Sequence, residues 1–435
     1  MHKNKKTFHW EDSTDTEAID IAFGRRNGKA RQNWINNFVG GKDHASPRYL
    51  TTKLNSITRC LFRNVDDELL EYVNEDGSLL NQNVIPMVLV NGSRGTGVGW
   101  SSRVPKYNPT EIIKNIRRKF KDLPVEEMTP WYKGFNGTVE KYEAEDKRGY
   151  FTYGLVDYNK KEGTCHIKEL PVGKCIEGYH KFLKSRSIGT EKNDYNPLIQ
   201  KFEKTGDAKK VGFRVTFNPD HAPHDIKDVI EKLDLKTKIS IDNMHLYNTR
   251  GQIEKFHSAE KILEDFYTIR LHWYDSRKAK MLSNLESCCE ELTNTIAFVR
   301  LVKKLNFDFL TKNSKDLQTY FKNLSVDAVR PEEQVGCDYG IYQSLLSLPL
   351  STFFDESLEK LEAKQSETKA EMDALSKKTN IDLWEDDLKA FQTEWDKEEE
   401  SSKSNVMAQQ ENQVEEEDIL QREVALEEIT LQGPL

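Results

Sequence analysis

The apolar positions divide the chain into a region of short, mixed elements followed by a region of long helices. Between about residues 105 and 240, segments such as GTVEKYEAE, YFTYGLVDY and VGFRVTF alternate apolar and polar residues and are rich in glycine and aromatics. This alternation predicts antiparallel strands in a mixed domain. From about Ser258 the apolar residues recur at helical spacing, Phe266 and Trp273 among them, which predicts a long amphipathic helix.

A second long helical run begins near Ser357 and reaches Phe391. Its apolar residues, such as Leu361 and Leu375, are separated by charged ones. Two charge-rich helices joined by a compact helical insert, at about residues 291–350, predict an antiparallel coiled-coil arm.

Shorter elements are predicted near the start of the chain. An apolar face over residues 65–74 indicates a helix, and the β-branched run VIPMVLV, residues 84–90, is typical of a buried strand. Asn108-Pro109-Thr110-Glu111 resembles a capping box with proline in the first turn and predicts another helix. The residues expected on the buried face of this helix are Ile112, Ile113, Ile116 and Phe120.

The other faces of that helix are basic. They carry Lys114, Arg117, Arg118 and Lys121. Such a ridge is commonly an ordinary solvated face, and the alternative interpretation is a set of contacts to the phosphates of a nucleic acid.

Charge is distributed unevenly along the chain. The 435 residues carry a net charge of −8, but residues 398–435 hold eleven acidic residues against two basic ones, a net −9. The rest of the chain is therefore close to neutral, at +1. The acidic, glutamine-rich end is expected to be disordered. No stretch reaches the ~20 apolar residues that a membrane span needs, and the basic N-terminus lacks the apolar region of a secretory signal.

A run of glycines follows the predicted strand at residues 84–90. It comprises Gly92, Gly95, Gly97 and Gly99. The spacing is not G-x-G-x-x-G and no βαβ unit follows, so a dinucleotide loop is the weaker interpretation and a turn the stronger.

The chemistry of the chain centres on GGKDHASPRYL, residues 40–50. Tyr49 is a poor nucleophile because a phenol titrates near ~10. The neighbouring Arg48 would favour the phenolate and hold a phosphate oxygen, which suits attack on a phosphodiester. From these residues alone, a structural loop tyrosine remains the alternative.

This segment resembles the active-site loop of eukaryotic type IIA DNA topoisomerases. The resemblance covers about residues 15–397 and is carried by DTEAIDIAF, RQNWINNF, IPMVLVNG with GTGVGW, PWYKGFNGTVE, IKELPVG, FYTIRLHWYDSRK, DYGIYQSLLSLPL and DLWEDDLKAF. It implies DNA breakage and reunion, in which Tyr49 joins covalently to a DNA 5′ end and Arg48 clamps the phosphate.

The resemblance also implies a domain organisation. The fold class is mixed α/β with an incomplete winged-helix remnant, a β-rich tower domain, a long antiparallel coiled-coil arm and a helical exit gate. The expected parts are a linker remnant at 1–38, a partial winged-helix region with the tyrosine loop at 39–104, the tower at 105–240, the arm and dimerisation gate at 241–397, and the acidic tail at 398–435.

Further site residues follow from the same resemblance. The expected DNA contacts are Lys42, Arg103, Lys106, Arg117 and Arg118. At the position where the family inserts an isoleucine between base pairs to bend DNA, this chain has Thr96. A threonine is shorter and more polar, and weaker bending is therefore expected.

The family uses Mg²⁺ and ATP, and the domains that bind them are not recognisable in this sequence. No D-x-D-G cluster is present, so no metal ligands are predicted. Phe38 runs directly into Val39 and Gly40, where the family has most of its winged-helix domain. We therefore expect the first 100 residues to form a fragment with exposed apolar side chains, and the chain alone not to cleave DNA.

The expected partners are DNA and a further polypeptide, either another copy of this chain or a full-length topoisomerase II, and no membrane. The resemblance implies the nucleus, although Lys3, Lys5 and Lys6 are a weak import signal. The alternative function is that of a non-catalytic DNA-binding and dimerisation protein that modulates a full-length enzyme.

Overall fold

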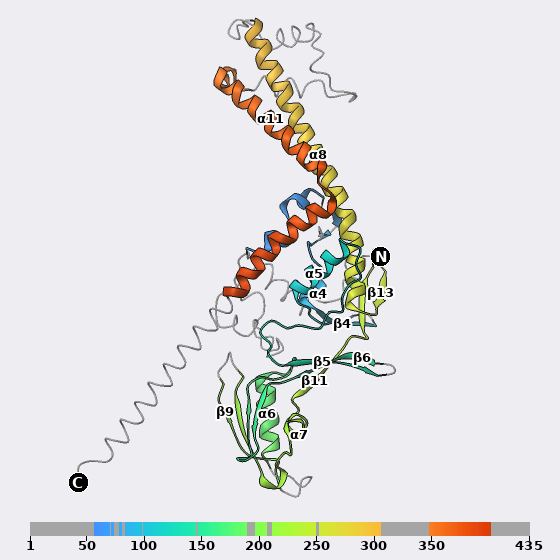
Figure 1. The fold of residues 1–435 in the computed structure, drawn as a ribbon, viewed down its shortest axis with the longest axis vertical. Helices are drawn as coiled ribbons and strands as arrows, with labels where there is room; N and C mark the ends of the chain where they lie inside the picture. The colour runs from blue at the N-terminus through green and yellow to red at the C-terminus, as the bar shows by residue number, and fades with distance from the viewer. Residues whose placement is uncertain are drawn as a thin grey trace, which may run out of the picture. The chain divides into compact units, whose positions relative to one another are not determined.

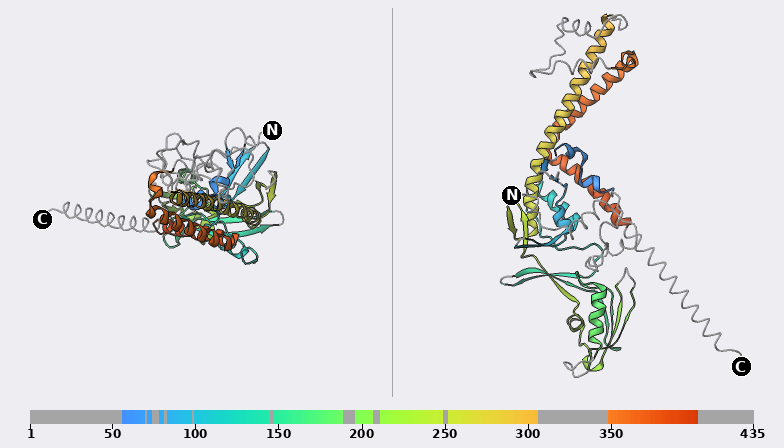
Figure 2. Two further views of the ribbon diagram at one scale, coloured as in Figure 1. Left: turned by 90° about the horizontal axis from the view of Figure 1, so that it is seen from above. Right: turned by 180° about the vertical axis from the view of Figure 1, so that it is seen from behind.

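The computed structural model describes residues 56–401 except for 70, 74–77, 81–82, 98, 145–146, 189–195, 207–210, 249–251 and 306–347. The chain divides into two compact units, residues 1–270 with 384–435 and residues 271–383. The architecture is mixed α/β with a helical C-terminal part, and Figures 1 and 2 show the elements from three sides.

The first unit begins with short elements. They are α3 (Thr58–Leu61), η4 (Asn64–Leu69), the antiparallel strands β1 (Glu71–Val73) and β2 (Ser78–Leu80), and α4 (Met87–Asn91). The helix predicted over residues 65–74 is wrong, because a short 3₁₀ helix is followed there by a strand. One reason is that the buried carboxylate of Asp66, in η4, is fixed by an ion pair with Arg270, and so short a helix has little stability of its own.

The strand predicted at residues 84–90 is also wrong, because α4 forms in this apolar run. A short buried run does not distinguish a strand from a helix by periodicity. Pro86 occupies the N-cap, and Gly92, with φ of 70°, ends the helix. A Cβ at Gly92 would lie 2.8 Å from the carbonyl oxygen of Val104, so the backbone passes here only because glycine has no side chain.

The predicted helix after Asn108 is confirmed as α5 (Pro109–Lys119). The Asn108 side chain accepts a hydrogen bond of 2.9 Å from the backbone N–H of Thr110, which satisfies one of the free donors at the helix start. Ile112, Ile113 and Ile116 are buried as expected. The carboxylate of Glu111 accepts from the backbone of Thr129.

Antiparallel sheets occupy the region where alternation predicted strands. A three-stranded sheet has the order β11 (Lys236–Ser240), β6 (Lys147–Tyr153), β5 (Thr138–Ala144). A four-stranded sheet has the order β7 (Val156–Asn159), β8 (Thr164–Ile167), β10 (Phe213–Phe217), β9 (Ile199–Lys204). Helices α6 (Ile176–Arg186) and α7 (Ile226–Lys232) lie beside the four-stranded sheet (Figure 1).

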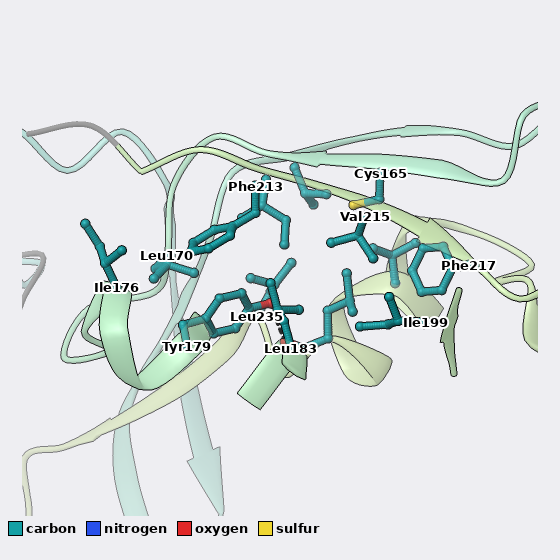
Figure 3. Packing of buried hydrophobic residues seen from close by; sticks show 14 residues of the cluster. Cys165, Leu170, Ile176, Tyr179, Leu183, Ile199, Phe213, Val215, Phe217 and Leu235 are labelled. Atoms are coloured by element: carbon teal, nitrogen blue, oxygen red, sulfur yellow. Dashed lines mark hydrogen bonds between the residues drawn. The ribbon is translucent and has the colours of Figure 1, made fainter. Parts of the chain in front are cut away.

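The core of this region forms between the four-stranded sheet and its helices (Figure 3). The hydroxyl of Tyr179, on α6, donates a hydrogen bond of 2.7 Å to the carbonyl oxygen of Leu233. The buried members are Val156, Cys165, Ile167, Leu170, Ile176, Tyr179, Leu183, Ile199, Phe213, Val215, Phe217, Val229, Leu233 and Leu235. A polar group on an aromatic body is thus satisfied inside an otherwise apolar core.

A second core gathers around Trp384, in the helical residues 380–401. Its indole is 0% exposed, and its Nε1 donates a hydrogen bond of 3.0 Å to the carbonyl oxygen of Val84. The ring stacks on Tyr267 at 5.3 Å between centroids and meets Phe120 edge-on, also at 5.3 Å. One side chain therefore joins the segment before α4, the end of α5 and the first turns of α8 (Ala259–Leu305).

Ion pairs reinforce the same junction. Arg270 on α8 and Asp66 on η4 form a pair of 3.0 Å whose side chains are 0% and 2% exposed. Arg63 pairs at 3.0 Å with the buried carboxylate of Asp387. Removing either partner of a buried pair would leave a charge in an apolar environment, which is strongly destabilising.

Apolar residues early in the chain are covered rather than exposed. Ile57, Leu61, Val84, Ile85 and Leu89 are all buried. The prediction of exposed apolar side chains is therefore wrong for the described residues between 56 and 100, because this segment is tied to the helix around Trp384. Residues 1–55 lie outside the described part of the chain.

The second unit consists of an antiparallel helix pair. In this unit, α11 (Asp355–Lys377) runs beside α8, with Lys303 paired to Asp355, Arg300 to Glu362, and Gln365 hydrogen-bonded to Thr293. The two long helices are confirmed. The first continues to Leu305, beyond the predicted start of the insert, and residues 306–347 of that insert lie outside the described residues.

Replacement of Trp384 should destabilise the first unit. Trp384→Ala removes the ring contacts and leaves the Val84 carbonyl without its donor, and we expect a loss of about 3–5 kcal/mol in the free energy of unfolding. Trp384→Phe keeps an aromatic ring and should lose less. Urea unfolding followed by circular dichroism measures both, and an unchanged unfolding midpoint for Trp384→Ala would contradict the assignment.

The buried carboxylate of Glu169 should make stability depend on pH. Its Oε2 accepts from the backbone N–H of Asn136 at 2.8 Å, yet burial raises the pKa of Glu169 above its ordinary value. The folded state thus favours the protonated form. This contribution to stability is complete below the unfolded pKa of ~4.3 and is lost as pH rises through the folded pKa.

The variant Glu169→Gln cannot titrate and isolates this contribution. From about pH 4 to pH 7, wild type should lose stability relative to Glu169→Gln. Thermal unfolding of both proteins across this range measures the difference, and parallel pH profiles would show that Glu169 contributes nothing.

Candidate nucleic-acid interface

A glycine-rich hairpin follows α4 and carries two of the predicted site residues. Strand β3 (Ser93–Gly97) pairs antiparallel with β4 (Trp100–Val104). The register places Arg94 opposite Arg103 and Thr96 opposite Ser101. The glycine run is therefore a hairpin, as the turn interpretation predicted, and its glycines lie in β3 and the turn.

The hairpin is fixed against a second one, β12 (Met244–Tyr247) with β13 (Ile253–Phe256), which Figure 1 shows beside it. The backbone N–H of Arg103 donates to the carbonyl oxygen of Asn243 at 2.7 Å. The Asn243 side chain donates to Ser101 Oγ at 2.7 Å, and the backbone N–H of His245 donates to Ser102 Oγ at 3.1 Å. Short serines near the tip thus accept hydrogen bonds that hold it in place.

The two faces of the hairpin differ in chemistry. Ser102 and Val104 are buried on the inner face. Trp100 shares that face and meets the His245 ring edge-on at 5.2 Å, while remaining 45% exposed. Arg94, Thr96 and Arg103 share the outer face with Ser101, and all but the half-buried Arg103 are exposed. We call these four residues the outer hairpin face.

Two like charges directly across a strand pair repel each other. Burial lowers the pKa of the Arg103 guanidinium from its ordinary value, and the charge of Arg94 lowers it further. Arginine nevertheless stays protonated in proteins. The outer hairpin face therefore concentrates positive charge where a phosphate could accept hydrogen bonds from both guanidinium groups.

The basic residues of α5 are engaged within the chain. Arg117 Nε lies 3.1 and 3.2 Å from the two carboxylate oxygens of Glu385, and its Nη1 donates to Gln392 at 2.9 Å. Arg118 pairs with Glu126 at 2.8 Å and donates to the carbonyl oxygen of Pro124. A phosphate would have to compete with these carboxylates, so a role of both arginines in DNA binding stays a prediction.

The remaining predicted residues fall into two groups. Lys106 is half-buried between β4 and α5, and its carbonyl oxygen accepts from the backbone N–H of Trp131 at 2.8 Å. Lys42, Arg48 and Tyr49 lie outside the described residues, so their roles also stay predictions.

Sequence reasoning missed Arg94 and His245 as neighbours of this face. Arg94 stands within the glycine run, between Ser93 and Gly95, so a charged residue in a tight hairpin was an available signal. His245 is separated from Ser101 by 144 positions and joins the hairpin only in the fold.

Metal-binding side chains are scattered rather than gathered in the described part of the chain. There, no three or more His, Cys, Asp or Glu side chains come together as a metal site would require. The described residues therefore do not fit a Mg²⁺ ion. No helix among them combines the length and apolar character needed to cross a bilayer.

Comparison with known proteins extends the resemblance across most of the chain. The family described as DNA gyrase/topoisomerase IV (A-type subunit) matches residues 32–389. DNA topoisomerase 2 of Pisum sativum is 36% identical over 390 residues, which are 81% of this chain and 26% of that protein. DNA topoisomerase 2 of Saccharomyces cerevisiae is 30% identical over 399 residues, with 81% and 28% covered.

A solved structure agrees in fold. The DNA-binding, cleavage and re-ligation domain of Plasmodium falciparum topoisomerase II superposes with a TM-score of 0.72 at 28% identity, covering 85% of this chain and 52% of that chain. The chain spans about a quarter of the length of the curated relatives that it matches. It belongs to the type II DNA topoisomerase family, and its homology is to the DNA breakage-reunion core.

Proposed function

We propose that this chain supplies the DNA-binding and cleaving segment of a type II topoisomerase. The observation that carries the proposal is the agreement in fold with a DNA-binding, cleavage and re-ligation domain over 85% of the chain. Together with the Arg48-Tyr49 pair, this agreement favours an enzyme that breaks and rejoins DNA through a covalent tyrosine intermediate.

The proposed reaction begins with Tyr49. Its phenolic oxygen attacks a phosphodiester, an O–P bond to Tyr49 forms, and the P–O3′ bond breaks. The phenolic proton is given up to a base, the 3′ oxygen takes up a proton, and the DNA 5′ end stays attached to Tyr49. Arg48 holds a phosphate oxygen and stabilises the negative charge that develops on it. Religation is the reverse of these steps.

In the family, Mg²⁺ supplies further charge stabilisation at the scissile phosphate. The described residues offer no ligand set for it, and no step proposed for this chain passes through a metal.

The outer hairpin face is the proposed contact to the DNA backbone. Arg94 and Arg103 would share a phosphate, and Lys42 and Lys106 would extend the contact along the duplex. Thr96 takes the position of the family's apolar wedge. A threonine offsets less of the cost of unstacking base pairs, so we propose that the duplex is held mainly by charge and bent less.

We also propose the finer organisation that the resemblance implies. Residues 1–38 form a linker segment, 39–104 the part of a winged-helix region that holds Tyr49, and 105–240 the tower. Residues 241–397 form the coiled-coil arm and dimer gate, and 398–435 an acidic tail. In this arrangement the chain acts in the nucleus as a dimer with itself or with a longer topoisomerase II.

The competing proposal is a non-catalytic DNA-binding protein that modulates a full-length topoisomerase II. The positive hairpin alone would serve such a role, because it needs no nucleophile. Only the covalent step separates the two functions.

A covalent trapping assay tests the catalytic proposal. The tagged chain is mixed with full-length DNA topoisomerase 2, Mg²⁺ and supercoiled DNA, and detergent traps adducts that are separated by size. We expect a covalent adduct of DNA with the tagged chain, and its loss in Tyr49→Phe because only the phenolic oxygen can form the bond. No adduct with either form, while the mixture still binds DNA, would favour the non-catalytic role.

The salt dependence of duplex binding tests the outer hairpin face. Each phosphate contact adds about 0.9 to the slope of log affinity against log salt concentration. Arg94→Gln and Arg103→Gln should each weaken binding and flatten the slope by about one unit. Lys168→Gln removes the same charge from an exposed position just after β8, in the four-stranded sheet region, and serves as the matched control. Unchanged slopes for both arginine variants would remove this face from the interface.

A further inference from the structure

The three-stranded sheet β11–β6–β5 has one buried face and one accessible face. Tyr150, Thr152 and Ile239 alternate onto the buried face. Phe151 and Tyr153 therefore lie on the other face of the central strand β6, and both are half-buried. Their register partners on the edge strand β11 are Lys238 and Lys236, both exposed.

A third ring completes this face from the opposite edge strand. Tyr142 on β5 lies opposite Gly149 and contacts Phe151 at 4.4 Å between ring centroids, and Phe151 lies 6.4 Å from Tyr153. A Cβ at Gly149 would lie 2.9 Å from the Tyr142 hydroxyl and 2.1 Å from the carbonyl oxygen of Ile239. Glycine thus lets the Tyr142 ring lie across the central strand, so that three rings form one continuous surface.

The two lysines lie over these rings. Lys236 Nζ is 3.8 Å from the Phe151 centroid and 5.4 Å from that of Tyr153, and Lys238 Nζ is 4.2 Å from that of Tyr142. Glu140, also on this face, accepts a hydrogen bond from the Tyr153 hydroxyl. The face is therefore positive overall, with two lysines against one carboxylate.

One polar atom on this face is not satisfied. The hydroxyl oxygen of Tyr142 is buried and has no hydrogen-bond partner among the residues that the structure describes. A buried hydroxyl without a partner is unfavourable, and a ligand that bears donors and acceptors could satisfy it.

We propose that the face formed by Tyr142, Phe151, Tyr153, Lys236 and Lys238, the aromatic face, binds single-stranded DNA. Unpaired bases stack on the rings, while the lysines swing off them and contact the phosphates. Exposed cation–π contacts are weak enough to be exchanged in this way. Aromatic residues at alternate positions of a central strand, with one more on a neighbouring strand, present ring surface as sheet proteins that bind single strands do.

The rings decide between the candidate ligands. In a duplex the base faces are stacked on one another, so a duplex would use the two lysines alone. An acidic peptide would also leave the rings unused. The proposal goes beyond duplex cleavage and uses none of the residues around Tyr49 or the outer hairpin face, so its test is independent of the proposed function.

Fluorescence anisotropy of the full chain with a labelled oligothymidylate of about 12 nucleotides tests the proposal. Phe151→Leu combined with Tyr153→Leu removes stacking and keeps apolar side chains, and we expect at least about tenfold weaker binding. Lys236→Gln with Lys238→Gln should weaken binding and flatten its salt dependence. Phe151→Trp keeps a stacking ring, should bind as wild type does, and should lose fluorescence when the oligonucleotide binds.

The matched control is Lys168→Gln with Lys201→Gln, two exposed lysines of the four-stranded sheet region, which should bind like wild type. Circular dichroism shows whether each variant is folded, and Phe151→Trp keeps the proposal testable if the leucine variants are not. Equal affinity for wild type and a folded leucine variant, or no change in tryptophan fluorescence, would overturn the proposal. Tighter binding of duplex DNA, oligouridylate or polyglutamate to the same face would overturn the choice of ligand.

Discussion

The burial of one indole ring holds the first unit together. Trp384 comes from a helix near the end of the chain, and its N–H reaches the carbonyl oxygen of Val84, 300 positions earlier. Around it pack Tyr267 from the start of the long helix and Phe120 from the end of α5. Because α4 leads directly into the hairpin of Arg94 and Arg103, the position of that hairpin depends on this contact. The buried pairs Asp66–Arg270 and Arg63–Asp387 fix the same segments by charge. The apolar contacts supply the stabilisation, and the charged pairs restrict which partners can meet.

The sequence predicted the elements whose periodicity is long or whose ends are marked. The start of α5 follows from Asn108 and Pro109, and the long helices follow from apolar residues repeated over many turns. The first errors came where these signals are short. Residues 65–74 have an apolar face but are governed by the ion pair of Asp66 with a residue 204 positions away, and VIPMVLV is compatible with either a strand or a helix. Contacts that span such separations leave no local pattern in the sequence.

The candidate site shows the same division. The glycine run and Arg103 were recognisable from the sequence, but the opposition of Arg94 and Arg103 requires the register of the hairpin. Similarly, Arg117 reads as a surface cation on an amphipathic helix, and only the fold shows that Glu385 and Gln392 hold its guanidinium. Residue type therefore predicts the chemistry that is available, whereas the tertiary contacts decide which charges are already neutralised within the chain.

The facing arginines of the hairpin have a consequence for how the protein responds to ionic strength. Without DNA, their repulsion opposes pairing of β3 with β4, by roughly 0.2–1 kcal/mol for like charges directly opposite, and dissolved ions screen that repulsion. With DNA, the same ions compete for the phosphates that would offset it. Salt therefore acts in opposite directions on the two states: it tightens the free hairpin and loosens the bound one. The strand pair would be least rigid in dilute solution without DNA, the condition in which its attraction for DNA is strongest.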